Sequence, residues 1–289
     1  MVAVALWRTS LEGAARGTLE LGKGKNCIVS SNCLPQLTEA TVHIWTWRLD
    51  VERDAVSELE SELSESECRR VRRYASHRIA RRFIVRRGML RRVLGLYLHL
   101  LPHQVQLFYN AHGKPLLADD ISLPLQFNMS DSGELAALAV GTGQPLGIDI
   151  EQLRPLPDWD ALAINFFSES ELNQLSQAAA TSRTEVFFRL WTRREAISKA
   201  EGVGLRQLSA QLLLNDQDER SPPAATSESI PRLQDNIVHE LTMPDGYVGA
   251  LAIQQEIAQI SYIDCVASAG SLQGKWMADS KLASGRSHS

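Results

Sequence analysis

Apolar and polar positions follow two different periods along the chain, and these periods predict its strands and helices. Alternation over residues 42–49, 105–108, 126–130, 135–140, 239–241, 246–254 and 257–264 is typical of strands. Apolar residues at helical spacing predict helices between about residues 64 and 100 and over residues 187–199. Strands and helices interspersed in this way indicate an α+β fold.

The stretch Gly-Ile-Asp-Ile-Glu at residues 147–151 alternates acids with isoleucines. Because successive strand side chains point to opposite faces, Asp149 and Glu151 should share one face while the isoleucines are buried on the other. Two carboxylates side by side repel each other, and a hard cation such as Mg²⁺ would remove that repulsion. An edge strand with a solvated acidic face is the alternative, and the stretch alone leaves both interpretations open.

A second acid stands beside a lysine on the helix predicted over residues 187–199. Glu195 and Lys199 lie one turn apart there, which by itself is typical of an ordinary surface ion pair. Gly202 and Gly204 follow directly. Glycines at these positions stop a helix and let bare backbone approach whatever lies in front of it, which favours a functional interpretation of the pair.

A short internal repeat indicates two similar halves. Leu-Ser-Glu-Ser-Glu at residues 63–67 recurs as Phe-Ser-Glu-Ser-Glu at residues 167–171, an offset of 104 (167 − 63). The same offset places Trp45 and Trp47 opposite Asp149 and Glu151, so only one half should bind a metal. We expect two α+β halves, residues 41–145 and 146–265, packed about a pseudo-twofold axis with the site in the cleft between them. Residues 1–40 are expected to be a poorly ordered extension and residues 266–289 a disordered tail.

The composition disfavours several classes of protein. The 289 residues carry a formal net charge of −4, so no overall positive field recruits nucleic acid or an anionic membrane. The four cysteines show no Cys-x-x-Cys spacing, which argues against a zinc site or a disulfide framework and suits a reducing cytosol. No apolar run approaches the length of a signal peptide or a membrane span. We expect a cytoplasmic protein.

Eleven arginines lie between residues 69 and 92, in the first helical region. This density indicates either a polyanion-binding surface or a solvated helix face. Aromatic residues do not interleave with these arginines as they do in single-strand binders, which disfavours nucleic acid. A compact polyanion fits better, because Arg holds phosphate with a planar, bidentate fork.

Several motifs in a fixed order resemble the signature series of the Sfp-type 4′-phosphopantetheinyl transferases. They are Gly-Lys-Pro at 113–115, Phe-Asn-Met-Ser-Asp-Ser at 127–132, Gly-Ile-Asp-Ile-Glu at 147–151, Phe-Phe-Ser-x-x-Glu at 166–171, Trp-x-x-Arg-Glu-Ala-x-x-Lys at 191–199 and Gly-x-Gly-Leu at 202–205. The match runs from about residue 41 to residue 265. The resemblance implies the two-half fold of that family. It also implies transfer of the 4′-phosphopantetheine arm of coenzyme A to a serine of an apo acyl or peptidyl carrier protein, with release of adenosine 3′,5′-bisphosphate.

The resemblance also implies roles for individual acids. Asp149, Glu151 and Glu195 would bind Mg²⁺ on the coenzyme A diphosphate, and Lys199 would add positive charge to the same oxygens. The proton of the carrier serine would go to Glu195, directly or through a metal-bound water, or to Glu171, and Glu171 could instead be a metal ligand or support one. These alternatives stay open at the level of sequence.

Coenzyme A contacts are implied as well. Arg82 best matches the position that grips the 3′-phosphate in the family, Arg78 matches less well, and Lys114 would reach the diphosphate. Ser130 and Ser132 could donate hydroxyls to phosphate, and Asp149 belongs to the coenzyme A site as well as to the metal site.

Two positions depart from the family pattern. Asp131 stands where the family usually has His in the coenzyme A phosphate site, and Arg194 stands where Lys is usual. A carboxylate at position 131 repels an anion unless a neighbouring arginine neutralises it. Either the local arginines compensate, or the 3′-phosphate is held less tightly.

Two other classes of function compete with the transferase. One is a different Mg²⁺-dependent enzyme of nucleotides, which the absence of a Gly-x-x-x-x-Gly-Lys-[Ser/Thr] loop disfavours. The other is a non-catalytic module that binds coenzyme A or a carrier protein. Because two halves in one chain would complete a site, we expect a monomer.

Overall fold

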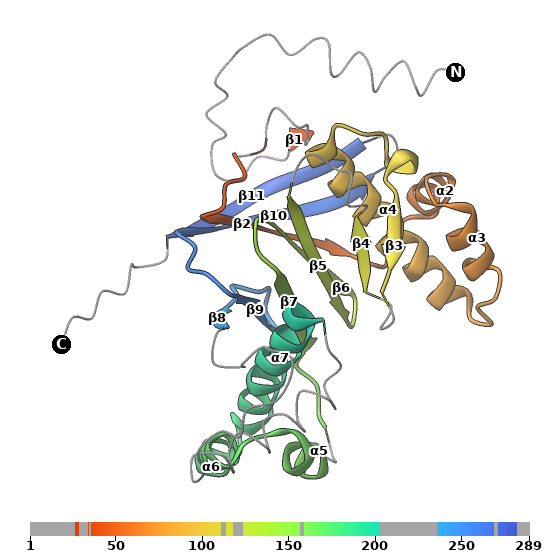
Figure 1. The fold of residues 1–289 in the computed structure, drawn as a ribbon. Helices are drawn as coiled ribbons and strands as arrows, with labels where there is room; N and C mark the ends of the chain where they lie inside the picture. Colours follow the sequence, from red (N-terminus) through yellow and green to blue (C-terminus); the bar gives the residue numbers. More distant parts are fainter. Residues whose placement is uncertain are drawn as a thin grey trace, which may run out of the picture.

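The fold is mixed α+β, as the alternation of periods predicts. The structure, a computed structural model, describes residues 27–28, 34, 36–110, 114–117, 124–156, 159–202, 236–268 and 271–281. Groups of strands and groups of helices follow one another along the described chain (Figure 1). None of the helices in these ranges is long and apolar enough to cross a membrane.

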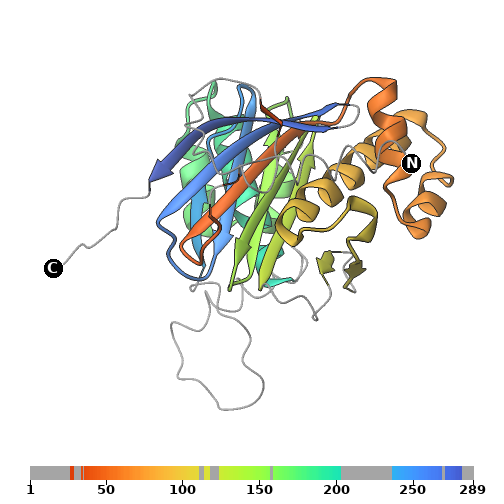
Figure 2. The same cartoon turned by 90° about the horizontal axis from the view of Figure 1, so that it is seen from above.

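Two sheets form the centre of the molecule. The larger has six strands in the order β1-β11-β10-β2-β6-β5, and the smaller has three in the order β7-β9-β8 (Figure 2). The strands of the larger sheet are β1 (Cys27–Ile28), β2 (Thr41–Arg48), β5 (Leu125–Ser132), β6 (Leu135–Thr142), β10 (Gln259–Ser268) and β11 (Ser271–Lys281). Those of the smaller sheet are β7 (Leu146–Gln152), β8 (Ile237–Glu240) and β9 (Tyr247–Ile253). Strand β2 pairs parallel with β10 and antiparallel with β6.

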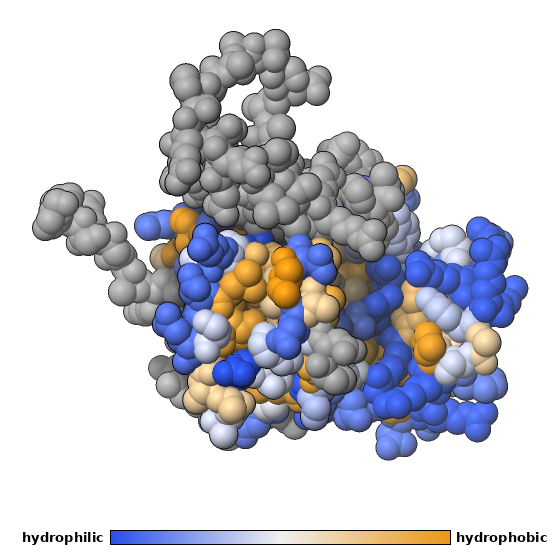
Figure 3. Space-filling view, turned by 90° about the horizontal axis from the view of Figure 1, so that it is seen from below, coloured by the Kyte–Doolittle hydropathy of each residue, from blue (hydrophilic) through white to orange (hydrophobic). Residues whose placement is uncertain are grey.

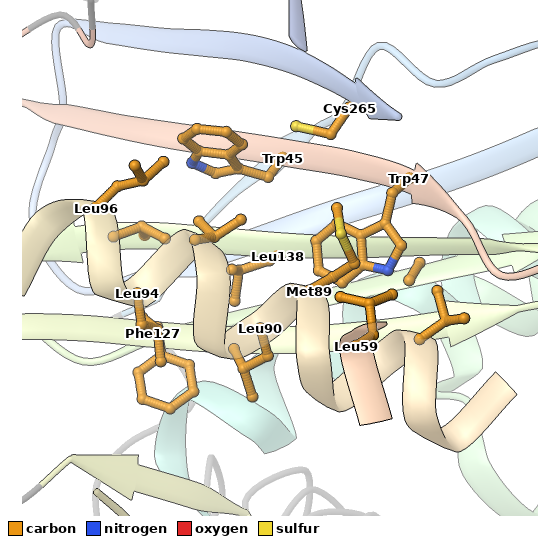
Figure 4. Close-up of a cluster of buried hydrophobic side chains, with 14 of the residues drawn as sticks. Trp45, Trp47, Leu59, Met89, Leu90, Leu94, Leu96, Phe127, Leu138 and Cys265 are labelled. Atoms are coloured by element: carbon orange, nitrogen blue, oxygen red, sulfur yellow. The ribbon is translucent and has the colours of Figure 1, made fainter. Parts of the chain in front are cut away.

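Helices cover one face of the larger sheet. They are α2 (Arg53–Ser61), α3 (Glu65–Val71) and the long α4 (His77–Leu98), followed by the 3₁₀ turn η2 (Pro102–Gln104) and a hairpin of β3 (Leu107–Tyr109) and β4 (Pro115–Leu117). Trp45 and Trp47 of β2 are fully buried against Met89, Leu90 and Leu94 of α4 (Figure 4). The tryptophans that replace the acids in the repeat are therefore core residues.

The opposite face of the larger sheet packs against the smaller sheet. Val42, Ile44 and Ala137 of the larger sheet share a buried cluster with Ile148 and Ile150 of β7. Helix α7 (Arg183–Glu201) covers the far side of the smaller sheet, and α5 (Trp159–Phe166) and α6 (Glu169–Gln177) lie at the end of α7 (Figure 1). The layers are thus helix, sheet, sheet and helix, with β5 and β7 as neighbouring edge strands.

The repeated stretch folds as the same local device in both halves. Ser64 caps α3 and Ser168 caps α6, each in a capping box with the glutamate three residues on, Glu67 or Glu171. A buried arginine of the long helix in each half also binds that glutamate. The symmetry axis between the halves stays a prediction.

The structure differs from the expectation at both ends of the chain. Residues 271–281, part of the expected disordered tail, form β11, and β10 continues to Ser268. Within the expected N-terminal extension, Cys27–Ile28 forms β1 and pairs with β11. The physical reason is a weak alternation that the prediction missed: Leu272, Trp276 and Ala278 occupy even positions, and pairing with β10 satisfies the backbone.

Candidate active site

The two acids of β7 face helix α7, as the alternation predicts. Ile148 and Ile150 are buried between the sheets, so Gly147, Asp149 and Glu151 lie on the other face. A Cβ atom on Gly147 would lie 2.0 Å from the carbonyl oxygen of Ala196 and 2.4 Å from the amide nitrogen of Ala200. Only glycine at this position lets the backbone of α7 lie directly on β7, and this close approach brings the helix that carries Glu195 and Lys199 to the acids.

Asp149 is buried, with two different oxygens. Its Oδ1 accepts hydrogen bonds from Lys199 Nζ at 2.7 Å and from Ser130 Oγ at 2.7 Å. Its Oδ2 is buried and has no hydrogen-bond partner among the residues that the structure describes. Burial raises the pKa of Asp149, while the charge and hydrogen bond of Lys199 and the hydroxyl of Ser130 act against that rise. A buried carboxylate oxygen without a partner is costly, so Oδ2 is suited to a cation or a donor that the protein itself does not supply.

Glu151, two residues further along β7, is held in the same way as Asp149, through one carboxylate oxygen. Ser132 Oγ donates to its Oε2 at 2.5 Å, and Arg154 Nη1 donates to the same oxygen at 3.0 Å. Within the described part of the chain no hydrogen bond reaches its Oε1. Each strand acid is therefore held through one oxygen only.

Glu195 completes the acidic group from α7. Its pKa is raised to about 7, chiefly by burial and then by the charge of Asp149, with a smaller contribution from Glu151 and with Lys199 acting in the opposite direction. Among the described residues it forms no hydrogen bond or ion pair of its own. The electrostatic coupling shows that the three acids predicted from sequence lie in one neighbourhood.

The acids do not form a finished metal site. In the ranges that the structure describes, no three His, Cys, Asp or Glu side chains are placed closely enough to hold a metal ion. Their chemistry nevertheless fits a hard cation, because Asp149 Oδ2 lacks a partner and Glu195 is held against two like charges. A bound Mg²⁺ would relieve both.

Two lysines meet beside these acids. Lys114 Nζ donates to the backbone carbonyl of Lys199 at 2.6 Å, across the boundary between the halves. Burial, followed by the charge of Lys199, lowers the pKa of Lys114 to about 8. Helix α7 ends two residues later at Gly202, whose φ of 72° is left-handed, as predicted for a glycine stop. Gly204 and Gly113 lie outside the described residues.

The arginines matched to the 3′-phosphate site are bound to an aspartate. Arg82 donates from Nε and Nη2 to Asp50 at 2.8 and 2.5 Å, and from Nη1 to the carbonyl of Gly133 at 2.7 Å. Arg78 donates to Asp50 at 3.3 Å. The hydrogen bond from Arg82 is the largest effect lowering the pKa of Asp50 to about 2. Arg82 therefore ties α4 to the β5–β6 turn and has little capacity left for a ligand.

Asp131 is neutralised by an arginine that the sequence did not single out. Arg86 Nη1 lies 2.7 Å from Asp131 Oδ1. Of the two outcomes left open for this departure, the structure favours local compensation. Other arginines of the cluster are also paired internally, among them Arg69 with Glu65, Arg91 with Glu67, and Arg92 with Glu58 and Glu62.

Arg87 differs from the other buried arginines of the described chain because no carboxylate pairs with it. It was not singled out from the sequence. It is 5% exposed, and its Nε and Nη1 are buried without a hydrogen-bond partner in the ranges that the structure describes. Its guanidinium lies over the rings of Phe83 and Tyr109, 5.7 and 5.3 Å from their centroids. Burial lowers its pKa. The sequence did contain an indication of this. Position 87 falls on the apolar face of α4 with Phe83, Leu90 and Leu94, where a charged side chain is unusual.

A basic surface adjoins Arg87. The guanidinium of Arg70 lies 5.2 Å from the centroid of the same Phe83 ring, and its Nε donates to Tyr74 at 3.1 Å. A hollow beside them is lined by Ser66, Arg69, Arg70, Arg73 and Tyr74. Figure 3 shows hydrophilic residues gathered over this side of the molecule, formed by α2, α3 and α4.

Glu171 is placed among other contacts than the three acids. Its Oε2 accepts from the backbone and hydroxyl of Ser168, at 2.8 Å each, and its carboxylate pairs with Arg194. Burial raises the pKa of Glu171, but the hydrogen bond and charge of Arg194, together with the hydrogen bonds of Ser168, outweigh it and lower the pKa below its ordinary value. In the described structure none of its contacts is with Asp149, Glu151 or Glu195. The fold thus brings together Asp149, Glu151, Glu195, Lys199, Lys114 and Ser130, and holds Glu171, Arg82, Arg78 and Asp131 in separate ion pairs.

Comparison with known proteins points to one family. Residues 145–252 match the family model described as the 4′-phosphopantetheinyl transferase superfamily, and residues 46–143 match the model described as 4′-phosphopantetheinyl transferase, N-terminal. The chain is 39% identical over 168 residues to the 4′-phosphopantetheinyl transferase HetI of Nostoc sp., covering 58% of this chain and 71% of HetI. It is 37% identical over 110 residues to AcpT of Escherichia coli, covering 38% of this chain and 55% of AcpT.

A further relative is Sfp of Bacillus subtilis, which is 32% identical over 135 residues, covering 46% of this chain and 58% of Sfp. Residues 145–252, which match the superfamily model, contain the two acids of β7, Glu195 and Lys199, and residues 46–143 contain Lys114 and Ser130. The two family models and these relatives agree, and the chain belongs to the 4′-phosphopantetheinyl transferase superfamily.

Proposed function

We propose that this protein transfers the 4′-phosphopantetheine arm of coenzyme A to a serine of an apo acyl or peptidyl carrier protein. The observation that carries the proposal is the convergence of Asp149, Glu195 and Lys199 where α7 lies on β7. In the reaction, the carrier serine oxygen forms a bond to the β-phosphorus, and the bond from that phosphorus to the bridging oxygen breaks. Adenosine 3′,5′-bisphosphate leaves, and the serine proton goes to a base.

Neutralisation of the diphosphate falls to the lysines. Lys199 and Lys114 are cations within one small region, and a pKa of about 8 leaves Lys114 mostly protonated at neutral pH. In phosphoryl-type transfer the protein forms few covalent bonds itself. Positioning of the reactants and stabilisation of charge therefore supply most of the catalysis. Lysine suits this task as a compact point charge.

Asp149, Glu151 and Glu195 are the residues that would hold Mg²⁺, Asp149 through its unpartnered oxygen. Bound there, Mg²⁺ supplies positive charge to the oxygens of the diphosphate. The protein's own contribution is to hold three acids on two rigid elements, β7 and α7, so that little reorganisation is needed when the substrate arrives.

Glu195 is our proposed base for the serine proton. Without a bound metal ion the pKa of Glu195 lies at about 7, which suits a carboxylate that accepts a proton near neutral pH. Glu171 is the weaker candidate because both its capping box and Arg194 already use its oxygens.

We propose that Arg87 and the neighbouring Arg70 bind the 3′-phosphate of coenzyme A. A buried guanidinium without a carboxylate is costly unless an anion compensates it, and Arg87 is such a group. The paired Arg82 and Arg78 then serve to hold the β5–β6 turn and Asp50 in place.

The protein acts, in this proposal, as a cytoplasmic monomer. Two halves in one chain supply all the side chains named above. Six of the eleven arginines between residues 69 and 92 have carboxylate partners, which reduces the charge available to nucleic acid or a membrane surface.

Mass spectrometry of an apo carrier protein, incubated with the enzyme, coenzyme A and Mg²⁺, tests the function. We expect the mass of the phosphopantetheine arm to be added to the carrier serine, and Asp149→Ala to lower the rate on the order of 10³-fold. Turnover of a nucleoside triphosphate without any carrier would instead indicate another nucleotide enzyme. Binding of coenzyme A or carrier with no mass shift would indicate a non-catalytic module.

A further inference from the structure

Strand β5 is joined to β7 by side chains rather than by a backbone ladder. Asn128, Ser130 and Ser132 alternate along one face of β5, and each bonds to the edge of β7. Asn128 Oδ1 accepts from the amide of Ile148 at 2.9 Å, and the serines reach the two acids. The edge strands of two different sheets are thus held in register by every second residue of β5.

The two serine contacts share a pattern. In each, a serine hydroxyl and one cation hold a single carboxylate oxygen: Ser130 with Lys199 on Asp149, and Ser132 with Arg154 on Glu151. The second oxygen of each acid has no hydrogen bond in the described residues. Both acids are therefore oriented through one oxygen and leave the other available.

We propose that Ser132 is a positioning residue that sets the orientation of Glu151, an inference that rests on the proposed function. A hydroxyl has one proton, and that of Ser132 goes to Glu151 Oε2. Its oxygen also accepts from the amide of Gln152 at 3.1 Å, so its rotamer is fixed from both sides. Ser132 consequently has no proton for a substrate phosphate, the role considered for it from sequence.

Arg154 strengthens the same orientation from the other side. Its Nη1 donates to Glu151 Oε2 and, at 3.1 Å, to the carbonyl of Gln152, and its guanidinium lies 5.2 Å from the ring centroid of Phe188 on α7. Glutamate has a long, flexible side chain, and two donors on one oxygen restrict it to one arrangement. Hydrogen-bond partners of ligating carboxylates typically contribute 10- to 100-fold to metal affinity or activity.

The experiment uses the full-length protein and Mn²⁺ as a paramagnetic probe. Mn²⁺ binding is measured by electron paramagnetic resonance with coenzyme A present and no carrier, so that no turnover occurs. Transfer kinetics with a carrier are measured separately. We expect Ser132→Ala to weaken Mn²⁺ binding about 10-fold and to lower kcat, with the KM values for coenzyme A and carrier within about twofold of wild type. Ser132→Thr, which keeps the hydroxyl, should restore both.

Ser176→Ala is the matched control, because Ser176 Oγ bonds only to the Asn173 carbonyl on an exposed helix face, and it should change neither quantity. Wild-type Mn²⁺ binding and kcat in Ser132→Ala would overturn the inference, as would a failure of the wild-type protein to bind Mn²⁺. If the wild-type protein binds Mn²⁺ and Ser132→Ala weakens it but no arm is transferred, the proposed function fails while the positioning role stands. Arg154→Gln provides a second route and should weaken Mn²⁺ binding in the same direction.

Discussion

Arg87 and Arg91 lie one turn apart on α4 and are almost equally buried, yet only Arg91 has a carboxylate partner. Arg91 Nε lies 2.8 Å from Glu67 Oε2, and its Nη1 donates to the carbonyls of Pro102 and Val105. Arg87 contacts two aromatic rings, and two of its nitrogens have no acceptor in the described part of the chain. At the scale of single residues, a buried ion pair and a buried arginine without a carboxylate partner among the described residues are separated by one helical turn.

Replacement of these two arginines by methionine should have opposite effects. Arg87→Met removes an uncompensated buried charge, so urea unfolding should show unchanged or increased stability while the KM for coenzyme A rises at least 10-fold. Arg91→Met leaves Glu67 buried without its partner and should cost about 3–5 kcal/mol. A large loss of stability in Arg87→Met with an unchanged KM would show that Arg87 is structural.

Glu195 gives the site a dependence on pH. Its pKa rises from 4.5 to about 7 on folding, so the folded state binds more protons than the unfolded state between these values. Stability contributed by this group is present below pH 4.5 and is lost as the pH rises through about 7.

We therefore expect Glu195→Gln, measured in EDTA, to melt higher than wild type at pH 8 and close to it at pH 5. Because Glu195 is partly exposed, the effect should be about 1 kcal/mol, or about 2–4 °C. Excess Mg²⁺ should narrow the difference at pH 8 by neutralising the wild-type carboxylate. Equal differences at both pH values would contradict the raised pKa.

At the scale of elements, the contact between β7 and α7 decides the site. Small residues line it: Gly147 on β7, Ala250 and Ala252 on β9, and Ala196 and Ala200 on α7. Their size lets the helix backbone approach the strand, and the approach brings Lys199 Nζ to 2.7 Å from Asp149. The geometry of the acids therefore depends on small residues that have no functional group of their own.

Gly147→Ala should separate these two elements. The added methyl group overlaps backbone atoms of α7, which cannot move aside as a flexible side chain could. We expect about 1–3 kcal/mol of destabilisation in urea unfolding and a fall in kcat larger than any change in the KM for coenzyme A. Gly249→Ala on the paired strand β9, where the nearest atom is a side-chain methyl at 3.0 Å, should be milder in both measurements. Similar losses in both variants would mean that the close approach of α7 is not the cause.

At the scale of the whole molecule, the two sheets meet along a polar seam as well as an apolar core. The apolar core joins their faces, and Asn128, Ser130 and Ser132 join the edge strands β5 and β7. Lys114 and Tyr247 add links between the halves, the latter accepting from the amide of Glu134 at 3.2 Å. The acids of the site lie directly on this seam.

Asn128→Ala tests the seam without touching a charged residue. The buried amide of Ile148 loses its acceptor, so we expect about 1–3 kcal/mol of destabilisation with an unchanged m-value in urea. Asn173→Ala, on an exposed helix surface, should stay within about 0.5 kcal/mol of wild type. An m-value that falls in Asn128→Ala would indicate instead that the halves unfold separately.

The sequence by itself determined what depends on short spacings. Alternation predicts that Asp149 and Glu151 share a face. The two capping boxes correspond to the repeated pattern Ser-x-x-Glu, and a glycine marks the end of α7. Strand β11 was missed because its alternation is weak, and its pairing with β10 supplies the missing stabilisation.

Only the tertiary structure decided which charges are paired. Asp50 with Arg82, Asp131 with Arg86, and Asp149 with Lys199 are 32, 45 and 50 residues apart in the chain. Within the eleven arginines between residues 69 and 92, the sequence does not distinguish one that pairs with a carboxylate from one that does not. Burial and ion pairing arise only when distant segments pack together. They distinguish the paired arginines from Arg87, whose Nε and Nη1 have no hydrogen-bond partner among the described residues.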